Sequence, residues 1–216
     1  MMRVVQWLLS RLYPPKCVLC QRLLAKEESD LCLECRKDLP VAERTSKHLR
    51  FVDTWTAALY YEGSVRESIL RYKFRGMRVY CSAYGRLLAA KISRALPEDW
   101  DCITYVPVGK KRLRRRGYDQ TCLLAEATAR ELGREAIRLL DKPKDNPAQS
   151  GIRDPEARRA NVAGVYRVSS DVKGKRILLI DDILTTGATA SECARVLKTA
   201  GAEKVYVAAL ACGRPK

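Results

Sequence analysis

From residue 56 onward, hydrophobic residues follow two patterns that alternate along the chain. Apolar residues spaced three and four apart are typical of amphipathic helices, and short apolar or β-branched runs are typical of strands. The first pattern predicts helices over residues 65–74, 84–96, 121–132 and 188–199. The second predicts strands over residues 56–61, 102–108, 136–140, 165–168, 176–181 and 204–210. This alternation predicts the α/β fold class with a mostly parallel sheet.

The last three predicted elements form one compact unit. Residues 176–181 read RILLID, a continuous apolar run that suits a strand buried on both faces. The helix over 188–199 and the strand over 204–210 follow, which predicts a right-handed βαβ unit. Ligands of such sheets bind beyond the carboxyl ends of the strands, where Asp181 and Asp182 lie.

The loop between this strand and the next helix carries the residues of a phosphate site. Backbone N–H groups at the start of a helix, together with the helix dipole, attract anions. A glycine lets the backbone approach a ligand closely, and threonine hydroxyls add hydrogen-bond donors. We expect the anion site to comprise Thr185, Thr186, Gly187, Ala188 and Thr189.

Asp181 and Asp182 add hydrogen-bond acceptors just before this loop. Paired carboxylates suit the vicinal hydroxyls of a sugar or a hydrated Mg²⁺. A phosphate site beside a diol site describes a ribose 5-phosphate. The simpler alternative is that Thr189 and Glu192 form a helix capping box. Capping leaves the two acids unexplained, because burial of a carboxylate is costly unless the carboxylate is paired.

The composition narrows the class of ligand. The chain has 216 residues, of which 47% are apolar and 31% are charged, so it can form an ordinary core and surface. Its 41 Lys and Arg residues exceed its 25 Asp and Glu residues, which leaves a formal charge of +16. Such a charge favours nucleic acid, phosphate-rich small molecules or an acidic membrane surface as partners, and solubility alone is the alternative explanation.

Several classes of protein are excluded by what the sequence lacks. No stretch approaches the ~20 apolar residues of a membrane helix, so we expect no transmembrane segment. The apolar run over residues 4–9 is too short for a secretory signal, and we therefore expect a cytoplasmic protein. The single His48 excludes any site that needs two histidines, and no G-x-x-x-x-G-K-[ST] sequence of a P-loop nucleotidase is present.

The cysteines predict a metal site near the N-terminus. Nine cysteines without a secretion signal fit a reducing compartment, and four of them form two C-x-x-C pairs, Cys17, Cys20, Cys32 and Cys35. Two such pairs can place four thiolates around one tetrahedral Zn²⁺. Disulfides and a redox C-x-x-C are the alternatives, and the reducing compartment and the doubled motif argue against them. Four Cys ligands leave no position for water, so we expect the zinc to be structural.

A strongly basic run follows the strand predicted over residues 102–108. It holds six cations in seven residues, namely Lys110, Lys111, Arg112, Arg114, Arg115 and Arg116. One or two of them suffice to stabilise a departing pyrophosphate. The excess favours contact with the phosphates of a nucleic acid, with Tyr118 placed to stack on a base, and a solvated loop is the alternative.

Two further segments are less specific. Arg153, Arg158 and Arg159 form a second basic cluster in a segment that its Pro and Gly residues predict to be a loop. Residues 3–13 predict a helix that packs on the cysteine-rich segment, contacts a partner or lies on a membrane surface.

Longer stretches of the chain resemble the ComF family of late-competence proteins, which includes ComFC-like and GntX-like members. Residues 177–189 resemble the phosphoribosyl pyrophosphate (PRPP) signature of type I phosphoribosyltransferases. The other matching segments are the four-cysteine ribbon with Cys35-x-x-Asp38-Leu39-Pro40, the run Val106-Pro107-Val108 with Arg116-Gly117-Tyr118-Asp119-Gln120, and Gln149 with Arg159-x-Asn161. The resemblance implies an N-terminal helix and a four-cysteine zinc ribbon over residues 1–42. It implies a type I phosphoribosyltransferase-like α/β domain over residues 43–216.

The resemblance also implies roles for individual residues. Residues 185–189 match the loop that binds the 5-phosphate of PRPP, and Asp181 and Asp182 match the acids that hold the ribose in catalysis. The turn after Pro107 corresponds to the pyrophosphate loop, and the segment around residues 149–161 corresponds to the active-site cover. This chain departs from the family pattern at two positions. The pattern leads us to expect a bulkier residue where Gly109 stands and an Asn where Asp119 stands.

Two functions are consistent with these observations. The first is a protein that binds PRPP with Mg²⁺ and single-stranded DNA, and that acts with the DNA-uptake machinery in natural transformation. The second is an active PRPP-dependent phosphoribosyltransferase of nucleotide metabolism or salvage, in which Mg²⁺-assisted loss of pyrophosphate leaves an oxocarbenium-like ribosyl centre. A PRPP-sensing regulator is a third possibility, but residues 1–55 show no helix-turn-helix pattern.

Overall fold

The computed structural model describes residues 14–43, 48–147, 151–152 and 154–215. The helix predicted over residues 3–13 lies outside these residues, as do Gln149 and Arg153 of the predicted cover segment. None of the helices in the described ranges is both long and apolar enough to cross a membrane.

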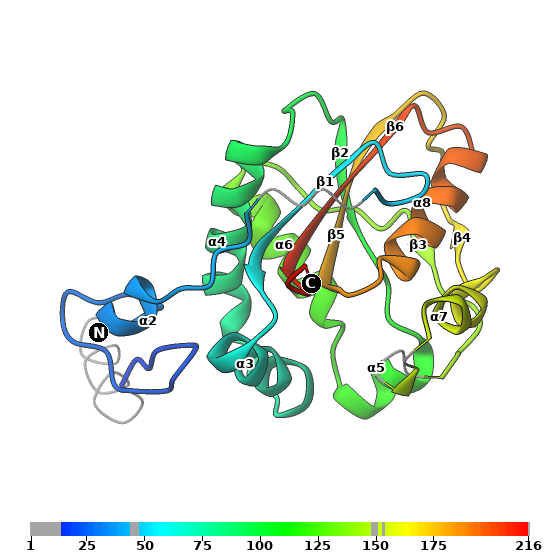
Figure 1. The fold of residues 1–216 in the computed structure, drawn as a ribbon. Coiled ribbons are helices and arrows are strands. Elements are labelled where there is room, and N and C mark those ends of the chain that lie inside the picture. The colour runs from blue at the N-terminus through cyan, green and yellow to red at the C-terminus, as the bar shows by residue number, and fades with distance from the viewer. Residues whose placement is uncertain (1–13, 44–47, 148–150, 153, 216) are drawn as a thin grey trace, which may run out of the picture.

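A four-stranded parallel sheet forms the centre of the larger domain, in the order β1-β6-β5-β2 (Figure 1). The strands are β1 (Thr54–Tyr60), β2 (Cys102–Tyr105), β5 (Arg176–Leu184) and β6 (Lys204–Cys212). Helices α3 (Gly63–Phe74), α4 (Tyr80–Ala95) and α6 (Gln120–Glu131) pack on one face, and α8 (Ala188–Thr199) packs on the other. The predicted fold class is confirmed, because every strand of this sheet is parallel to its neighbour.

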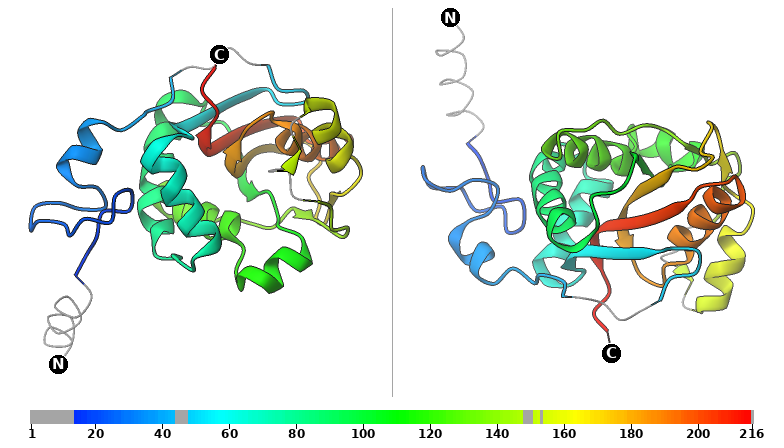
Figure 2. Two further views of the ribbon diagram at one scale, coloured as in Figure 1. Left: turned by 60° about the horizontal axis from the view of Figure 1, so that its bottom comes forward. Right: turned by 90° about the horizontal axis from the view of Figure 1, so that it is seen from above.

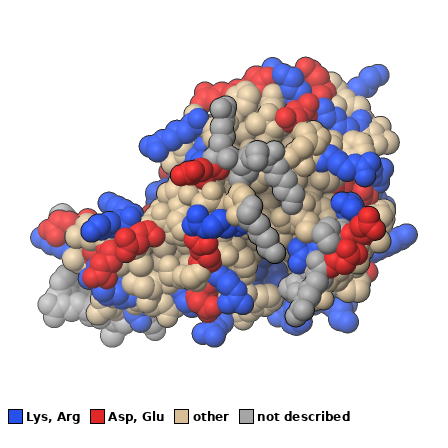
Figure 3. Space-filling model, in the orientation of Figure 1, with Lys and Arg blue, Asp and Glu red and all other residues tan. Residues whose placement is uncertain are grey.

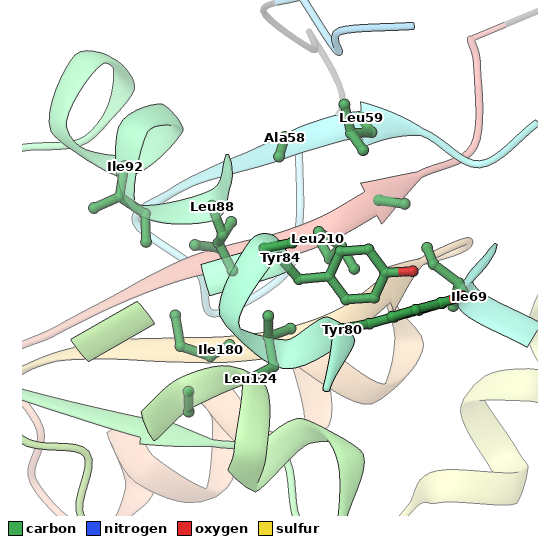
Figure 4. Close-up of a cluster of buried hydrophobic side chains, with 14 of the residues drawn as sticks. Ala58, Leu59, Ile69, Tyr80, Tyr84, Leu88, Ile92, Leu124, Ile180 and Leu210 are labelled. Carbon is green, nitrogen blue, oxygen red and sulfur yellow. The ribbon is translucent and has the colours of Figure 1, made fainter. Parts of the chain in front are cut away.

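The central strand β5 is buried on both faces. Leu178 and Ile180 belong to the apolar cluster under α4 and α6, which Figure 4 shows around Tyr84, Leu88 and Leu124. Ile177 and Leu179 belong to the cluster under α8, and all four β5 side chains are fully buried. This burial explains why the strand reads as a continuous apolar run instead of an alternating one.

Most predicted elements are confirmed, and their ends shift for local reasons. The helix predicted over 188–199 has those bounds, whereas β5 and β6 run past the predicted strand ends. The strand predicted over 102–108 ends at Tyr105, shortly before Pro107, which has no N–H group to donate to a ladder. The strand predicted over 136–140 is reduced to one bridge between Ala136 and Ile103 and the short β3 (Leu140–Asp141). The strand predicted over 165–168 is reduced to β4 (Arg167–Val168), which pairs antiparallel with β3.

The basic run folds as a short helix, α5 (Lys110–Arg116), and not as the solvated loop that was the alternative for it. Asp145 accepts a hydrogen bond from the backbone N–H of Lys111 at 3.1 Å, near the start of this helix. The helix ends at Gly117, whose φ of 75° is left-handed and is adopted by glycine without strain. Part of the predicted cover loop is also helical, because Asp154 caps α7 (Pro155–Val162) by accepting from the N–H groups of Glu156 and Ala157.

The cysteine-rich N-terminal segment packs against α3 and α4 (Figure 2). It contains the short helix α2 (Leu33–Lys37). The carbonyl groups of Val18 and Leu19 accept hydrogen bonds from Arg71, and the Val18 carbonyl also accepts from Ser68. Cys17, Val18 and Leu31 are buried in the same apolar cluster as the two helices. The segment therefore shares a core with the larger domain.

Candidate functional site

The two adjacent acids of β5 lie inside the protein rather than on its surface. Each of Asp181 and Asp182 has only 6% of its surface exposed, and the strand continues beyond them to Leu184. Because successive side chains of a strand point to opposite faces, the two carboxylates have different surroundings. Asp182 faces the side of α3 and α6, and Asp181 faces the side of α8.

Asp182 is held by two residues that the sequence analysis did not single out. Lys73 Nζ, at the end of α3, lies 2.8 Å from Asp182 Oδ1. Gln120 Nε2, at the start of α6, donates to Asp182 Oδ2 at 2.8 Å. Burial by itself raises the pKa of Asp182, but the charge and hydrogen bond of Lys73, the hydrogen bond of Gln120 and the charge of Arg116 together outweigh burial and keep this pKa below its usual value. Asp182 is therefore an ionised acceptor in a paired environment.

Asp181 has the opposite character. Burial, and then the charge of Asp182, raise the pKa of Asp181 to about 8, and the N–H of Asp182 donates to Asp181 Oδ1 at 2.8 Å. On the same side lies Lys142, which is 6% exposed and donates to the hydroxyl of Tyr166 at 3.3 Å. Burial lowers the pKa of Lys142 to about 8. Two titratable groups whose pKa values burial shifts to about 8 thus lie on the same side of β5, and the charge of each acts on the other.

The predicted phosphate loop turns sharply between β5 and α8. Gly187 is the N-cap of α8 with a φ of 78°, and a Cβ at this position would clash with the end of the Leu49 side chain. Only glycine fits both the left-handed backbone and this close approach. Thr185 is exposed, and Arg158 Nη1 of α7 donates to its hydroxyl at 2.7 Å. The structure therefore brings one arginine of the second basic cluster to the predicted phosphate loop.

The capping-box alternative for this loop is wrong. Glu192 does not reach back to the start of α8, because its carboxylate accepts from the N–H of Gly164 at 2.8 Å and from Arg195. The N-cap of the helix has no side-chain hydrogen bond of its own. A different threonine acts locally, since the Thr186 hydroxyl accepts from the N–H of Ala188 at 3.4 Å.

The six cations of α5 have two different roles. Arg112 donates to the carbonyls of Asn146 and Pro147 at 2.8 and 3.0 Å, and Arg116 donates to Gln120 Oε1 at 2.7 Å. These two arginines fasten the helix to the rest of the domain. The other four cations are exposed around a shallow depression beside Asp145, and they are Lys110, Lys111, Arg114 and Arg115. The lower margin of the molecule, where α5 lies, carries Lys and Arg side chains in Figure 3.

The structure does not support the expectation that Tyr118 stacks on a base. Tyr118 is only 6% exposed, its hydroxyl donates to the carbonyl of Tyr72, and the Arg78 guanidinium lies 4.6 Å from its ring centroid. The residue after it, Asp119, is the N-cap of α6 and also accepts from the N–H of Val108 at 3.1 Å. Tyr118 therefore lies inside the protein. Hydrogen bonds to Gly117, Tyr118 and Asp119 hold the turn in this position.

The four predicted zinc ligands come together in the N-terminal segment. The sulfurs of Cys17, Cys20, Cys32 and Cys35 all lie within 4.8 Å of one another. Cys20 Sγ and Cys32 Sγ are 3.7 Å apart, close to the ~3.8 Å that a tetrahedron with Zn–S bonds of about 2.3 Å requires. The N–H of Cys35 donates to Cys32 Sγ at 3.4 Å and lowers the pKa of Cys32, whereas burial raises the pKa of Cys20 and of Cys35. The donor set fits one structural Zn²⁺.

Comparison with known proteins matches both parts of the chain. Residues 8–47 match the double zinc ribbon domain, and residues 119–216 match the phosphoribosyl transferase domain. The chain is 31% identical over 141 residues to the competence protein ComFC of Bacillus subtilis (strain 168), a match that covers 65% of this chain and 56% of that protein. It is 27% identical over 203 residues to the DNA utilization protein YhgH of Escherichia coli (strain K12), covering 88% and 87%. It is 25% identical over 224 residues to competence protein F of Haemophilus influenzae (strain Rd), covering 91% and 96%.

This chain belongs to the ComF family. Its larger domain is of the type I phosphoribosyltransferase kind, with an N-terminal zinc ribbon, as the resemblance implied. Among solved structures it is similar to the glutamine PRPP amidotransferase of B. subtilis complexed with ADP and GMP. That match has 21% identity and a TM-score of 0.45, and it covers 65% of this chain and 30% of the amidotransferase chain.

The sequence analysis missed three residues of this ComF-family site and named a fourth, Arg158, only as part of the second basic cluster. Lys73 and Gln120 hold Asp182, Lys142 lies on the side of Asp181, and Arg158 contacts Thr185. Lys73 and Gln120 come from helices far from the acids in sequence, and Lys73 is separated from Asp182 by 109 positions. Of the three missed residues only Gln120 carried a signal, because it belongs to the Arg116–Gln120 run that resembles the family.

The opposite surroundings of the two acids predict opposite effects of their amides on stability. In the unfolded chain Asp181 ionises near its ordinary pKa of 3.8, whereas in the folded protein it holds its proton up to about pH 8. The folded state therefore binds the extra proton, and this acid costs more stability as the pH rises from about 4 to about 8. Asp181→Asn should raise the melting temperature at pH 7 by several degrees, and the gain should shrink at pH 5.

Asp182→Asn should do the reverse, because it leaves the buried end of Lys73 without its carboxylate. We expect a loss of roughly 1–3 kcal/mol in the free energy of unfolding at pH 7. Thermal melts of both variants at pH 5 and pH 7 measure the two effects. A destabilised Asp181→Asn protein, or a stabilised Asp182→Asn protein, would contradict the assignment.

The ribbon predicts one zinc per chain and a dependence of stability on it. Cys32→Ser should lose the metal and lower the melting temperature by at least about 10 °C, because the small ribbon has little core without zinc. Metal analysis of purified protein and thermal melts test this expectation. Cys122→Ser, outside the cluster, is the control and should retain a full equivalent of zinc.

Proposed function

We propose that this ComF-family chain binds PRPP, or a similar ribose 5-phosphate ligand, and single-stranded DNA during DNA uptake and processing in natural transformation. The observation that carries the proposal is the position of the paired acids and the threonine loop, which follow each other at the carboxyl end of the central strand. The printed names of the relatives, which are competence and DNA utilization proteins, support the competence role.

The loop over residues 185–189 has the groups that a 5-phosphate needs. Thr185 is exposed at the turn, Gly187 brings the backbone close, and α8 directs its N-terminus toward the loop. Arg158 adds a cation within hydrogen-bond distance of the Thr185 hydroxyl. A phosphate in this loop would receive hydroxyl and guanidinium hydrogen bonds in addition to backbone N–H groups.

The acids of β5 have the groups that the ribose needs. Asp182 is ionised and accepts hydrogen bonds, so it suits sugar hydroxyls, which would share it with Lys73. Asp181 lies beside it, and Lys142 supplies a positive charge on the far side. Mg²⁺ would arrive with PRPP and neutralise its diphosphate, and the carboxylate oxygens of Asp181 and Asp182 are donors of the kind that it prefers.

The exposed cations of α5 support the proposal of a DNA-binding surface. Among the described residues, none of Lys110, Lys111, Arg114 and Arg115 forms an ion pair. Four unpaired cations on one short helix are more than a single diphosphate requires. They suit the row of phosphates along a nucleic-acid strand. The nine thiols, all free of disulfides, are consistent with action in the cytoplasm.

An active phosphoribosyltransferase is the second candidate function. The observation that favours it is Lys142. Its Cδ lies 3.7 Å from the position that a Cβ on Gly109, in the proposed pyrophosphate turn, would occupy, and its charge acts on Asp181. A cation there would stabilise pyrophosphate as it leaves C1 of the ribose. Release of pyrophosphate in the presence of a base or amine acceptor would establish this activity.

The PRPP site predicts that affinity depends on both acids. The double variant Asp181→Asn with Asp182→Asn should bind PRPP and Mg²⁺ at least tenfold more weakly, because it loses the charged acceptors of the ribose hydroxyls. Calorimetry on the folded variant measures the change. Glu67→Gln, an exposed acid on the same helix as Lys73, should leave the affinity unchanged. Equal PRPP affinity of the double variant and the parent would place the ligand elsewhere.

The DNA surface predicts steep salt dependence. Arg114→Glu with Arg115→Glu should weaken binding of a single-stranded oligonucleotide at least tenfold at low salt and reduce the salt slope by about 1.4. Arg116 is excluded from this variant because it is bound to Gln120. The control, Arg94→Glu with Arg130→Glu on exposed positions of α4 and α6, has the same change in charge. If both double variants lose the same affinity, net charge rather than α5 binds the strand.

A further inference from the structure

An exposed aromatic ring lies between the proposed DNA surface and the acids. Phe74, the last residue of α3, has 55% of its surface exposed, and Val79, at the end of the turn that follows, has 73% exposed. A single exposed apolar residue is common and needs no explanation. The surroundings of Phe74 are unusual because Arg75 and Arg78 in the same turn are also exposed.

Two contacts join this turn to the basic helix α5. The guanidinium of Arg116 lies 4.7 Å from the ring centroid of Phe74, a distance typical of a cation–π contact. Arg78 Nη2 donates to the carbonyl of Gly117, the residue that ends α5, at 3.1 Å. The exposed ring and the exposed cations of α5 therefore belong to one continuous surface.

The same ring is also adjacent to the twin acids. Its neighbour Lys73 lies 2.8 Å from Asp182. Arg116, which lies over the ring, donates to Gln120, and Gln120 donates to the other oxygen of Asp182. Phe74 is thus at the rim of the proposed ribose site, on the side that faces α5.

We propose that Phe74 is a stacking platform for an unpaired base of a nucleic-acid strand whose phosphates lie along α5. The inference rests on the single-stranded DNA binding of the proposed function. It names the residue that distinguishes a single strand from a duplex. An aromatic ring beside unpaired cations matches a base beside its phosphates, and each base offers a face to stack on. A duplex does not fit, since its bases are already stacked on one another. An apolar protein partner does not fit either, because exposed arginines surround the ring.

This assignment also replaces the role expected for Tyr118. That tyrosine is buried under Arg78, whereas Phe74 lies at the surface on the same side of the domain. We therefore assign stacking to Phe74, which precedes Tyr118 by more than forty positions, and not to Tyr118, which follows the basic run.

The test compares two oligonucleotides of equal length and charge, one of deoxythymidines and one with abasic sites at every position. The parent protein should bind the base-bearing strand roughly tenfold more tightly than the abasic strand. Phe74→Leu keeps apolar bulk and removes the aromatic ring, so it should lose this preference while it retains the salt dependence given by α5. Phe74→Trp should restore the preference. The fluorescence of 2-aminopurine in the strand should be quenched by the parent and by Phe74→Trp, but not by Phe74→Leu.

Phe51→Leu is the matched control, because Phe51 is also exposed, at 44%, and has the Arg50 guanidinium 5.5 Å from its ring, but it lies before β1. It should leave the preference unchanged. Equal binding of the two strands by the parent, or an unchanged preference in a folded Phe74→Leu protein, overturns the inference and leaves DNA binding standing. If the parent binds neither strand, the DNA part of the proposed function and this inference fail together.

Discussion

The organisation of this domain depends on the burial of two adjacent carboxylates in its central strand. A strand sends consecutive side chains to opposite faces, so Asp181 and Asp182 cannot share one partner. Asp182 is neutralised by Lys73 and Gln120, which come from helices on one face. Asp181, on the other face with Lys142, keeps its proton up to about pH 8. Burial of these two acids costs free energy of folding. Such a cost is typical of a ligand-binding site and not of residues that stabilise the fold.

Helix α3 links the zinc ribbon to this pair of acids. Near its middle, Ser68 and Arg71 donate to carbonyl groups of the ribbon, and at its end Lys73 reaches Asp182. A ribbon too small to hold a core of its own thus packs against the helix that neutralises the site. The two domains expected from the resemblance share buried side chains across this contact.

The basic run is divided between structure and surface. Arg112 and Arg116 are used to hold α5 in place, and the hydrogen bonds of Arg112 reach the segment before α7. Asn161 of α7 donates to the Pro147 carbonyl, and Arg158 of the same helix contacts the phosphate loop. One set of contacts therefore connects the surface proposed for DNA with the loop proposed for the 5-phosphate.

The sequence by itself determined the features that depend on neighbouring residues. The parallel sheet, the helix over 188–199 and the zinc ligands follow from apolar runs, helical spacing and C-x-x-C pairs, which are local patterns. Only the tertiary structure decided that Lys73 pairs with Asp182, that Tyr118 is buried and that α5 is a helix beside Asp145. These outcomes join residues 34 to 109 positions apart, and a linear pattern holds no record of which distant side chain will fill the space beside a buried charge.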